Sequence, residues 1–115
     1  MIDQIVFFQR KDHVKESSQH VVGVKFKQRS DASLQTPTNI YYKLTDLWSG
    51  ATVLDWTSVS ADDEIDITIT ATQNALRDQC RDYEVRELAV AANYGLADQF
   101  VDTITYRLEN TAAVT

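Results

Sequence analysis

The sequence predicts an all-β protein: a single antiparallel two-sheet β-sandwich of about seven strands, with residues 1–115 as one domain. In residues 64–70 (EIDITIT), isoleucines alternate with polar residues, which is the period of a half-buried strand. Further runs rich in β-branched and aromatic residues follow at short intervals, separated by polar turns. No segment of ten residues has the apolar spacing of an amphipathic helix.

The N-terminal part predicts two strands and two exposed loops. Residues 4–10 are an apolar run that favours a first strand, and residues 11–19 (KDHVKESSQ) are almost entirely polar and predict a loop. Residues 20–28 alternate as a second strand whose inward side chains are Val22, Val24 and Phe26. The second exposed loop is predicted at 30–39, which holds the only proline.

A hairpin is predicted next. Residues 40–45 and 52–58 alternate as strands, and residues 46–50 (DLWSG) have the composition of the turn that joins them. Trp56 lies near the end of the second strand, and we expect its large ring to pack across the sandwich.

The C-terminal half predicts a turn and two long strands. Residues 73–78 are too short for a stable helix and predict one turn that carries the chain between the sheets. Strands are expected at 83–92 and 100–109, with a turn at Gly95. The apolar parity changes within the first of these strands, which predicts a β-bulge at residues 86–87. Residues 110–115 are expected to fray or to dock on a partner.

Charge and composition narrow the classes of partner. A net charge of −6 disfavours nucleic acid and anionic membrane, because both reward basic residues. Residues 1–43 carry seven Lys and Arg against four Asp and Glu, whereas residues 44–115 carry four against thirteen. Such an asymmetry is compatible with paired edges within one fold or with paired faces between subunits. We expect a homo-oligomer. There is no apolar run long enough to span a membrane and no signal-peptide pattern, so synthesis in the cytoplasm is expected.

We expect no metal or cofactor. His13, His20 and Cys80 do not have the short ligand spacings of a zinc site, and the lone cysteine cannot form an intramolecular disulfide. The acidic cluster at residues 62–66 lacks the glycine and the spacing of a calcium loop, so we interpret it as an exposed turn.

We also expect no enzyme activity and no catalytic residue. The sequence contains no nucleophile elbow, phosphate-binding loop or metalloprotease motif. Glu84, Arg86 and Glu87 are interpreted as charges that pair on a strand surface. Lys25 and Lys27 flank Phe26, which single-strand nucleic-acid binders also show, but we expect the two lysines to protect a sheet edge.

The order of elements in residues 64–109 resembles the closing strands of an immunoglobulin-like domain. The residues that carry this resemblance are Ile65, Ile67, Ile69, Leu76, Asp78, Tyr83 and Tyr106. The spacing departs from that pattern, because Tyr83 follows Asp78 by five residues and Cys80 precedes the tyrosine. The resemblance implies an immunoglobulin-like sandwich, and a jelly-roll-like one remains the alternative.

Residues 41–110 also resemble small virion proteins of tailed bacteriophages. The matching stretches are YYKLTDLWSGATVLDWT, ITITATQNALRD, YEVRELAVAANYG and TITYRLEN. Proteins of this kind are capsid cement, decoration or tail-associated subunits without catalytic residues. The resemblance implies that the chain is located in the virion and contacts phage capsid or tail proteins.

The sequence therefore favours a structural virion subunit, most simply a capsid cement or decoration protein. A tail or neck protein and a carbohydrate- or protein-binding sandwich module are the alternatives. Phe8, Tyr41 and Trp48 are the candidate interface residues, because aromatic rings offer flat apolar area for contact.

Overall fold

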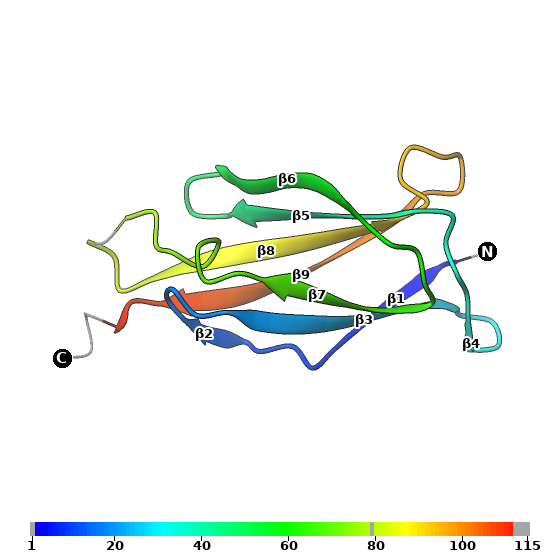
Figure 1. Cartoon of the computed structure of the whole chain (residues 1–115), viewed down its shortest axis with the longest axis horizontal. Helices are drawn as coiled ribbons and strands as arrows, with labels where there is room; N and C mark the ends of the chain where they lie inside the picture. Colours follow the sequence, from blue (N-terminus) through cyan, green and yellow to red (C-terminus); the bar gives the residue numbers. More distant parts are fainter. Residues whose placement is uncertain (1, 79, 112–115) are drawn as a thin grey trace.

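A computed structural model describes residues 2–78 and 80–111. They form an all-β structure of two sheets packed together, as predicted (Figure 1). The described chain has nine strands instead of about seven: β1 (Gln4–Phe8), β2 (His13–Lys15), β3 (His20–Gln28), β4 (Ser33–Leu34), β5 (Ile40–Asp46), β6 (Thr52–Val59), β7 (Glu64–Ile69), β8 (Tyr83–Ala92) and β9 (Phe100–Glu109). The two additional strands, β2 and β4, are short pieces inside the predicted loops at 11–19 and 30–39.

The smaller sheet has four strands, with β3 at its centre. β1 and β7 pair antiparallel with β3 on its two sides, and β4 forms a short hairpin with the end of β3. Because β3 is flanked on both sides, the expectation that Lys25 and Lys27 protect a sheet edge is wrong. Phe26 points into the core as expected, and Lys25 forms an ion pair of 3.6 Å with Glu64 on β7.

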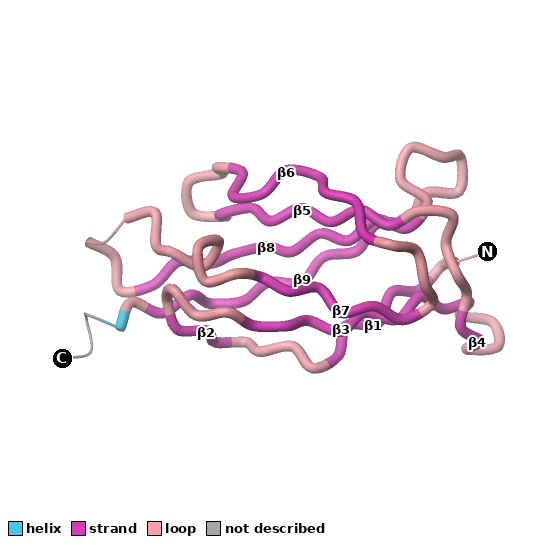
Figure 2. The backbone as a smooth tube through the Cα atoms, in the orientation of Figure 1, coloured by secondary structure: helices cyan, strands magenta, loops and turns pink. Residues whose placement is uncertain are grey.

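The larger sheet has five strands in the order β2-β9-β8-β5-β6. Its neighbours are antiparallel except at one edge, where β2 runs parallel to β9 with Val14 opposite Leu108. The sandwich is thus not wholly antiparallel. The chain leaves the four-stranded sheet after β1 and joins the five-stranded sheet at β2, and Figure 2 shows this crossing as a loop between two strands.

The core lies between the two sheets and is built from alternating side chains. Ile65, Ile67 and Ile69 on β7 are buried and the residues between them are exposed, as the sequence predicted. β3 contributes the expected inward row, and on β9 the buried row includes Ile104, Tyr106 and Leu108. Residues 73–78 belong to an irregular turn that connects the two sheets, and Gly95 has φ +79 in the turn between β8 and β9.

The predicted β-bulge at residues 86–87 is wrong. β8 and β9 pair without a shift from Tyr83 opposite Glu109 to Ala92 opposite Phe100. One continuous inward row therefore runs along β8, and none of its members is exposed: Glu84, Arg86, Leu88, Val90 and Ala92. The expectation of surface charges at Glu84 and Arg86 is also wrong, since the turn after β7 covers both and supplies their partners.

The position of Trp56 also differs from the prediction. The register between β5 and β6 shifts after Tyr42, where Leu44 pairs with Leu54. Trp56 lies 5.0 Å from the ring of Tyr94, on the outer face of the five-stranded sheet, and does not cross the sandwich. Register irregularities of this kind turn a side chain to the opposite face.

Candidate functional site

The fold places the three candidate interface residues on two opposite faces. Phe8 lies on the outer face of the four-stranded sheet, opposite Gly23 on β3, and the ammonium of Lys25 lies 4.9 Å from its ring centre. The ring of Phe8 occupies the space that a side chain at position 23 would need. Tyr41 and Trp48 lie on the outer face of the five-stranded sheet, at the two ends of β5.

Trp48 belongs to a stack of aromatic and cationic side chains that we call the Trp48 cluster: Trp48, Arg81, Tyr83 and Arg107. The Trp48 ring meets the Tyr83 ring edge-on at 6.1 Å, and the guanidinium of Arg81 lies 4.8 Å from the Trp48 ring. Arg107 lies 3.7 Å from the ring of Tyr83. Trp48 remains 57% exposed and Leu47 beside it 44%, so the cluster presents apolar surface to solvent.

Asp46 holds the turn that carries Trp48. Its carboxylate has no exposure and accepts hydrogen bonds from the Trp48 N–H at 3.2 Å and from the Ser49 hydroxyl at 2.7 Å. The Leu47 N–H donates to the carbonyl of Val85 on β8. These bonds fix the turn against the sheet, so the exposed indole is held by a well-supported backbone.

A second aromatic group, the Tyr94 cluster, lies at the opposite end of β5. The Tyr94 ring lies 4.7 Å from Tyr41 and 5.0 Å from Trp56. All three side chains are half-buried. Ala91, which faces the same side from β8, has no exposed surface. Tyr41 is therefore a packed member of a cluster and offers less open area than Trp48.

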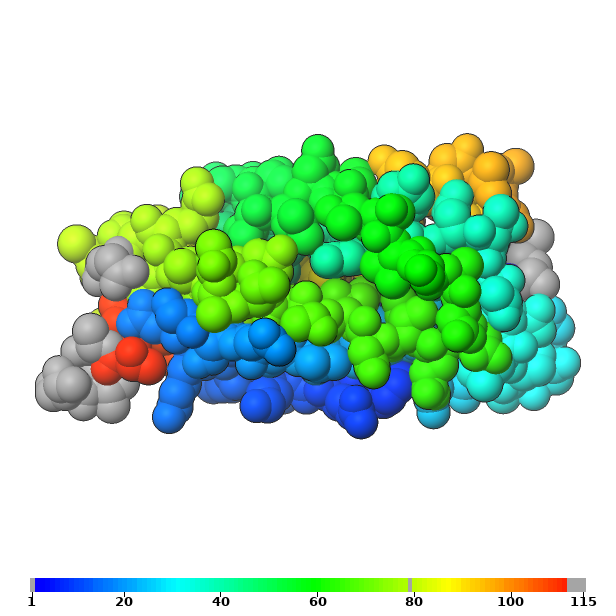
Figure 3. Space-filling model, viewed as in Figure 1, coloured from blue at the N-terminus to red at the C-terminus, as the bar shows by residue number. Residues whose placement is uncertain are grey.

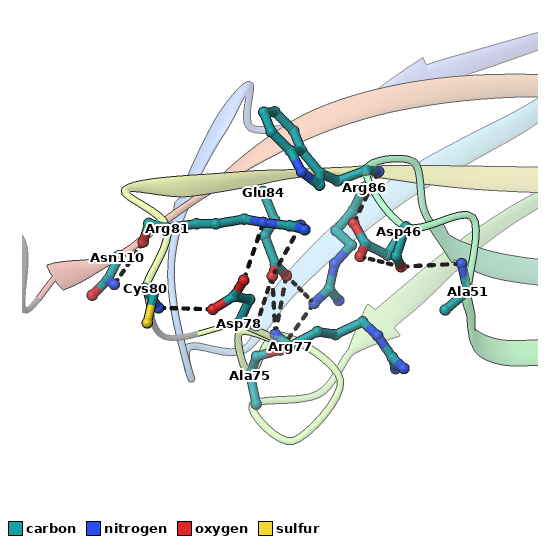
Figure 4. A network of polar contacts seen from close by, with 12 residues as sticks. Asp46, Ala51, Ala75, Arg77, Asp78, Cys80, Arg81, Glu84, Arg86 and Asn110 are labelled. Atoms are coloured by element: carbon teal, nitrogen blue, oxygen red, sulfur yellow. Dashed lines mark hydrogen bonds and ion pairs between the residues drawn. The ribbon is translucent and has the colours of Figure 1, made fainter.

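A buried ion pair lies beneath the Trp48 cluster, on the inner side of β8 (Figure 4). Glu84 Oε1 accepts a hydrogen bond from Arg86 Nη2 at 2.9 Å, and neither side chain is exposed. The Glu84 carboxylate also accepts the backbone N–H groups of Arg77, at 3.1 Å, and Asp78, at 3.0 Å. Arg81 lies 3.9 Å from it. A buried carboxylate needs such donors, because burial removes its hydration.

Arg86 completes the attachment of the turn after β7. Its Nη1 donates to the carbonyl of Gln73 at 2.7 Å, and its Nη2 donates to the carbonyl of Ala75 at 2.9 Å. The two charged residues thus bind both N–H and C=O groups of one irregular turn. Their partners include backbone atoms of a turn whose path cannot be predicted from the sequence. The only sequence feature that indicated burial of Glu84 and Arg86 is that both lie on the same face of the strand as Leu88.

A second buried polar group ties the same turn to the start of β3. The Tyr106 hydroxyl donates to Asn74 Oδ1 at 2.7 Å, and Asn74 Nδ2 donates to the Ser18 carbonyl at 2.7 Å. Asn74 Nδ2 also lies 2.9 Å from His20 Nδ1. Burial raises the pKa of the Tyr106 phenol well above its ordinary value, so the hydroxyl keeps its proton as a donor.

The pockets among the described residues include the following two. One of about 470 Å³ opens between β6 and the turn after β7, which lie side by side in the space-filling view (Figure 3), and Val53, Arg77 and Arg86 contribute to its wall. The other, of about 220 Å³, lies beside β2 and is lined by Lys11, His13, Val14, Lys15, Ser18, Gln19 and His20.

The described residues contain no group of three or more His, Cys, Asp and Glu side chains placed to hold a metal ion. Cys80 is an exposed free thiol, and Asp66 is exposed on the outer side of β7. Within the same part of the chain, no helix is long and apolar enough to cross a membrane.

Comparisons with protein-family models, with curated proteins and with solved structures found no match to this chain.

Proposed function

We propose that this chain is a structural subunit of a bacteriophage virion, most simply a capsid cement or decoration protein that stabilises neighbouring subunits. It would be made in the host cytoplasm, would act in the virion, and would need neither a cofactor nor a catalytic residue. The observation that supports the proposal is the exposed indole of Trp48, which lies on a turn that is held in place by hydrogen bonds to the Asp46 carboxylate.

The Trp48 cluster has the composition of an interface centre. Tryptophan, tyrosine and arginine are the residues that most often dominate binding energy between proteins. Here Trp48 and Tyr83 lie between the guanidinium groups of Arg81 and Arg107, next to the exposed Leu47. Because the supporting turn is already ordered by Asp46, little further conformational entropy would be lost on contact.

The strand order supports an immunoglobulin-like sandwich over a jelly-roll-like one. The four-stranded sheet has β3 between β1 and β7, and the five-stranded sheet has the order β9-β8-β5-β6 beyond the short β2. In a variable-type immunoglobulin domain, the A, B and E strands likewise share one sheet, and the G, F, C and C′ strands share the other. Tyr106 donates a hydrogen bond to Asn74 in the turn between β7 and β8. Tyr83 does not have this role, because its ring packs against Trp48.

Two alternatives use the same surface. A tail or neck protein would also bury the Trp48 cluster, against a different neighbour. A carbohydrate- or protein-binding module would use exposed aromatic rings as its platform, and the open ring of Trp48 favours that alternative, whereas Tyr41 is partly covered by Tyr94.

Co-sedimentation with phage particles tests the proposal. Purified protein is mixed with empty capsids and, separately, with tails of tailed phages, and the fraction that pellets with each is measured. We expect pelleting with capsids, and we expect Trp48→Ala to reduce it at least tenfold in apparent affinity. Leu96→Ala is the matched control, since Leu96 is 45% exposed but lies in the turn between β8 and β9.

The outcomes separate the three functions. Pelleting with tails alone would assign the chain to the tail or neck. Three results together would overturn the structural proposal in favour of the binding module. The protein would not pellet with any particle, would stay monomeric at high concentration in sedimentation equilibrium, and would bind a glycan array through Trp48. Equal pelleting of both variants would show that the Trp48 cluster is not the contact surface.

A further inference from the structure

β1 is an edge strand whose outer side is free. It borders the four-stranded sheet, and within the described chain it pairs only with β3. Figure 3 shows the first residues, in dark blue, at the lower border of the molecule. β1 has the sequence QIVFF, without charge, proline or glycine, and its register with β3 is unbroken from Gln4 to Phe8. Natural edge strands usually avoid pairing with other chains by means of charges, prolines or bulges, and β1 has none of these.

The other edge strands of the described chain each have a feature that opposes such pairing. β7 carries the exposed carboxylates of Glu64 and Asp66. β6 is irregular in its register with β5 and has the exposed Asp55 near its middle. The part of β9 that β2 leaves unpaired carries the exposed Asp102, and β2 and β4 are only three and two residues long. Among these edges, β1 is therefore the one best suited to pairing with a further strand.

The bonds of β3 show which backbone groups of β1 point outwards. Phe26 donates its N–H to the carbonyl of Asp63, on the β7 side of β3. The carbonyl of the next residue, Lys27, accepts from the N–H of Asp3, on the β1 side. Because this direction alternates along a strand, the odd-numbered residues of β3 face β1, and their partners in the register are the even-numbered residues of β1.

Ile5 and Phe7 therefore direct their N–H and C=O groups away from the sheet. No turn or loop of the described chain forms a backbone hydrogen bond with them. Their side chains face the core: Ile5 is 6% exposed, and Phe7 packs against the core but stays half-buried at the border of the sheet. A further strand at this position would pair with the free backbone groups and cover the ring of Phe7.

We propose that two copies of the chain associate through β1, which pairs antiparallel with β1 of the second copy about a twofold axis at Val6. Ile5 would exchange hydrogen bonds with Phe7 of the second copy, and Phe7 with Ile5 of the second copy. The two four-stranded sheets would then form one continuous sheet, and each Phe7 ring would lie beside Ile5 of the other copy. The contact is closed by its own symmetry.

The charge pattern of β1 fits a second copy of the same strand. The outer row of Gln4, Val6 and Phe8 would face the same row in reverse, so no like charges would lie opposite each other. The nearest cation on this face, Lys25, is held within its own copy by a 3.6 Å ion pair with Glu64 and lies 4.9 Å from the ring centre of Phe8. Self-pairing of β7 would instead bring its carboxylates together, which is destabilising.

The same side of the sandwich offers further apolar surface. β1 lies beside β9, and β2 pairs with β9 only from Arg107 onwards. The start of β9 is thus also open, with a half-buried Phe100 and with Val101 41% exposed. Stable interfaces bury about 1,200–2,000 Å² in total, so apolar surface next to the paired strands adds to the contact.

Val6→Glu tests the pairing without changing the core. Val6 is half-buried on the outer face, opposite Lys25, so the new carboxylate has a cation within its own copy and the fold is kept. At the twofold axis two carboxylates would face each other, which opposes association. Val21→Glu is the matched control, because Val21 is half-buried on the outer face of β3, an inner strand that the second copy does not reach.

Sedimentation equilibrium over a range of protein concentrations gives the dissociation constant of the dimer. We expect a reversible monomer–dimer equilibrium for the wild type. Val6→Glu should weaken association at least tenfold, whereas Val21→Glu should change it less than twofold. The circular dichroism spectra of the three proteins should be the same.

Amide hydrogen exchange of the wild type identifies the strand that pairs, and it depends on no variant. The amides of Ile5 and Phe7 should exchange fast in dilute protein and at least tenfold more slowly as the dimer forms. The amide of Val6 faces β3 and should be protected at both concentrations.

Three results would each overturn the proposal: a protein that stays monomeric at its highest soluble concentration, a dimer that Val6→Glu leaves equally strong, or protection that grows with concentration on another strand in place of Ile5 and Phe7. The pairing is independent of the virion role. A dimer through β1 that pellets with no phage particle would uphold the pairing and contradict only the function proposed for the Trp48 cluster.

Discussion

Glu84 and Arg86 lie two residues apart on β8, and their charged groups are 2.9 Å from each other with no exposed surface on either side chain. Together they hold the turn after β7 through the N–H groups of Arg77 and Asp78 and the carbonyls of Gln73 and Ala75. The pair lies on the inner face of β8, and Tyr83 of the Trp48 cluster lies on the outer face of the same strand. Its integrity therefore affects both the stability of the sandwich and the proposed contact surface.

Glu84→Gln should destabilise the protein by about 3–5 kcal/mol, because it leaves the charge of Arg86 buried without a counter-ion. The free energy of unfolding, measured by urea denaturation, checks this. Glu87→Gln is the control, because Glu87 is half-exposed on the opposite face of β8, and its effect should stay within about 0.5 kcal/mol. A loss below about 1 kcal/mol for Glu84→Gln would mean that the carboxylate is not buried in solution.

Ile67→Asp should abolish folding. Ile67 is 2% exposed at the centre of the inward row of β7, and an unpaired carboxylate there costs several kcal/mol against a total stability of about 5–15 kcal/mol. Circular dichroism and thermal melting are the measurements. Thr68→Asp, one residue along on the exposed face, should retain the native spectrum, and a folded Ile67→Asp protein would contradict the assignment of faces.

His20 should make the protein less stable as the pH falls. The pKa of His20 in the folded state is lowered from 6.5. As the pH falls below 6.5, the imidazole therefore becomes protonated in the unfolded chain before it becomes protonated in the folded chain. Well above pH 6.5 the imidazole of His20 is neutral in both the folded and the unfolded state, and His20 does not reduce the stability. The loss of stability grows as the pH falls through 6.5 towards the lowered pKa. Comparison of unfolding free energies at pH 7.5 and 5.5 should show a smaller loss for His20→Asn than for the wild type. Equal losses would mean that His20 is accessible to protons in the folded state.

Cys80→Ser should leave the fold and the assembly unchanged. The thiol is exposed and forms no disulfide in the described chain. The backbone N–H of residue 80 donates to the Asp78 carboxylate, which a serine at this position preserves. The melting temperature should change by less than about 2 °C, in line with a surface substitution. A loss of soluble protein would disprove this.

Much of the strand pattern is determined by the sequence alone. β3 and β9 have the predicted residue ranges, and β7 differs at one terminal residue, because each alternates between apolar and polar side chains over enough residues to define the period. β8 also has its predicted range, although its apolar parity changes at residues 86–87. The same alternation identified the buried rows of β3 and β7. The hairpin between β5 and β6 was also predicted, since its turn residues lie directly between two alternating runs.

Tertiary structure determines the burial and the partners of the side chains that form the candidate sites. Glu84 and Arg86 were assigned to the surface because their partners are backbone atoms of a turn brought over β8 only by the packing of the two sheets. Trp56 changed faces because β6 shifts its register against β5, and β2 became a strand because β9 offered a parallel edge. Likewise, Asn74 contacts Ser18 and His20 only because the fold brings these segments together across more than fifty residues of sequence. Local periodicity defines which side of a strand is apolar, but the identity of a buried polar residue's partner depends on contacts between distant segments.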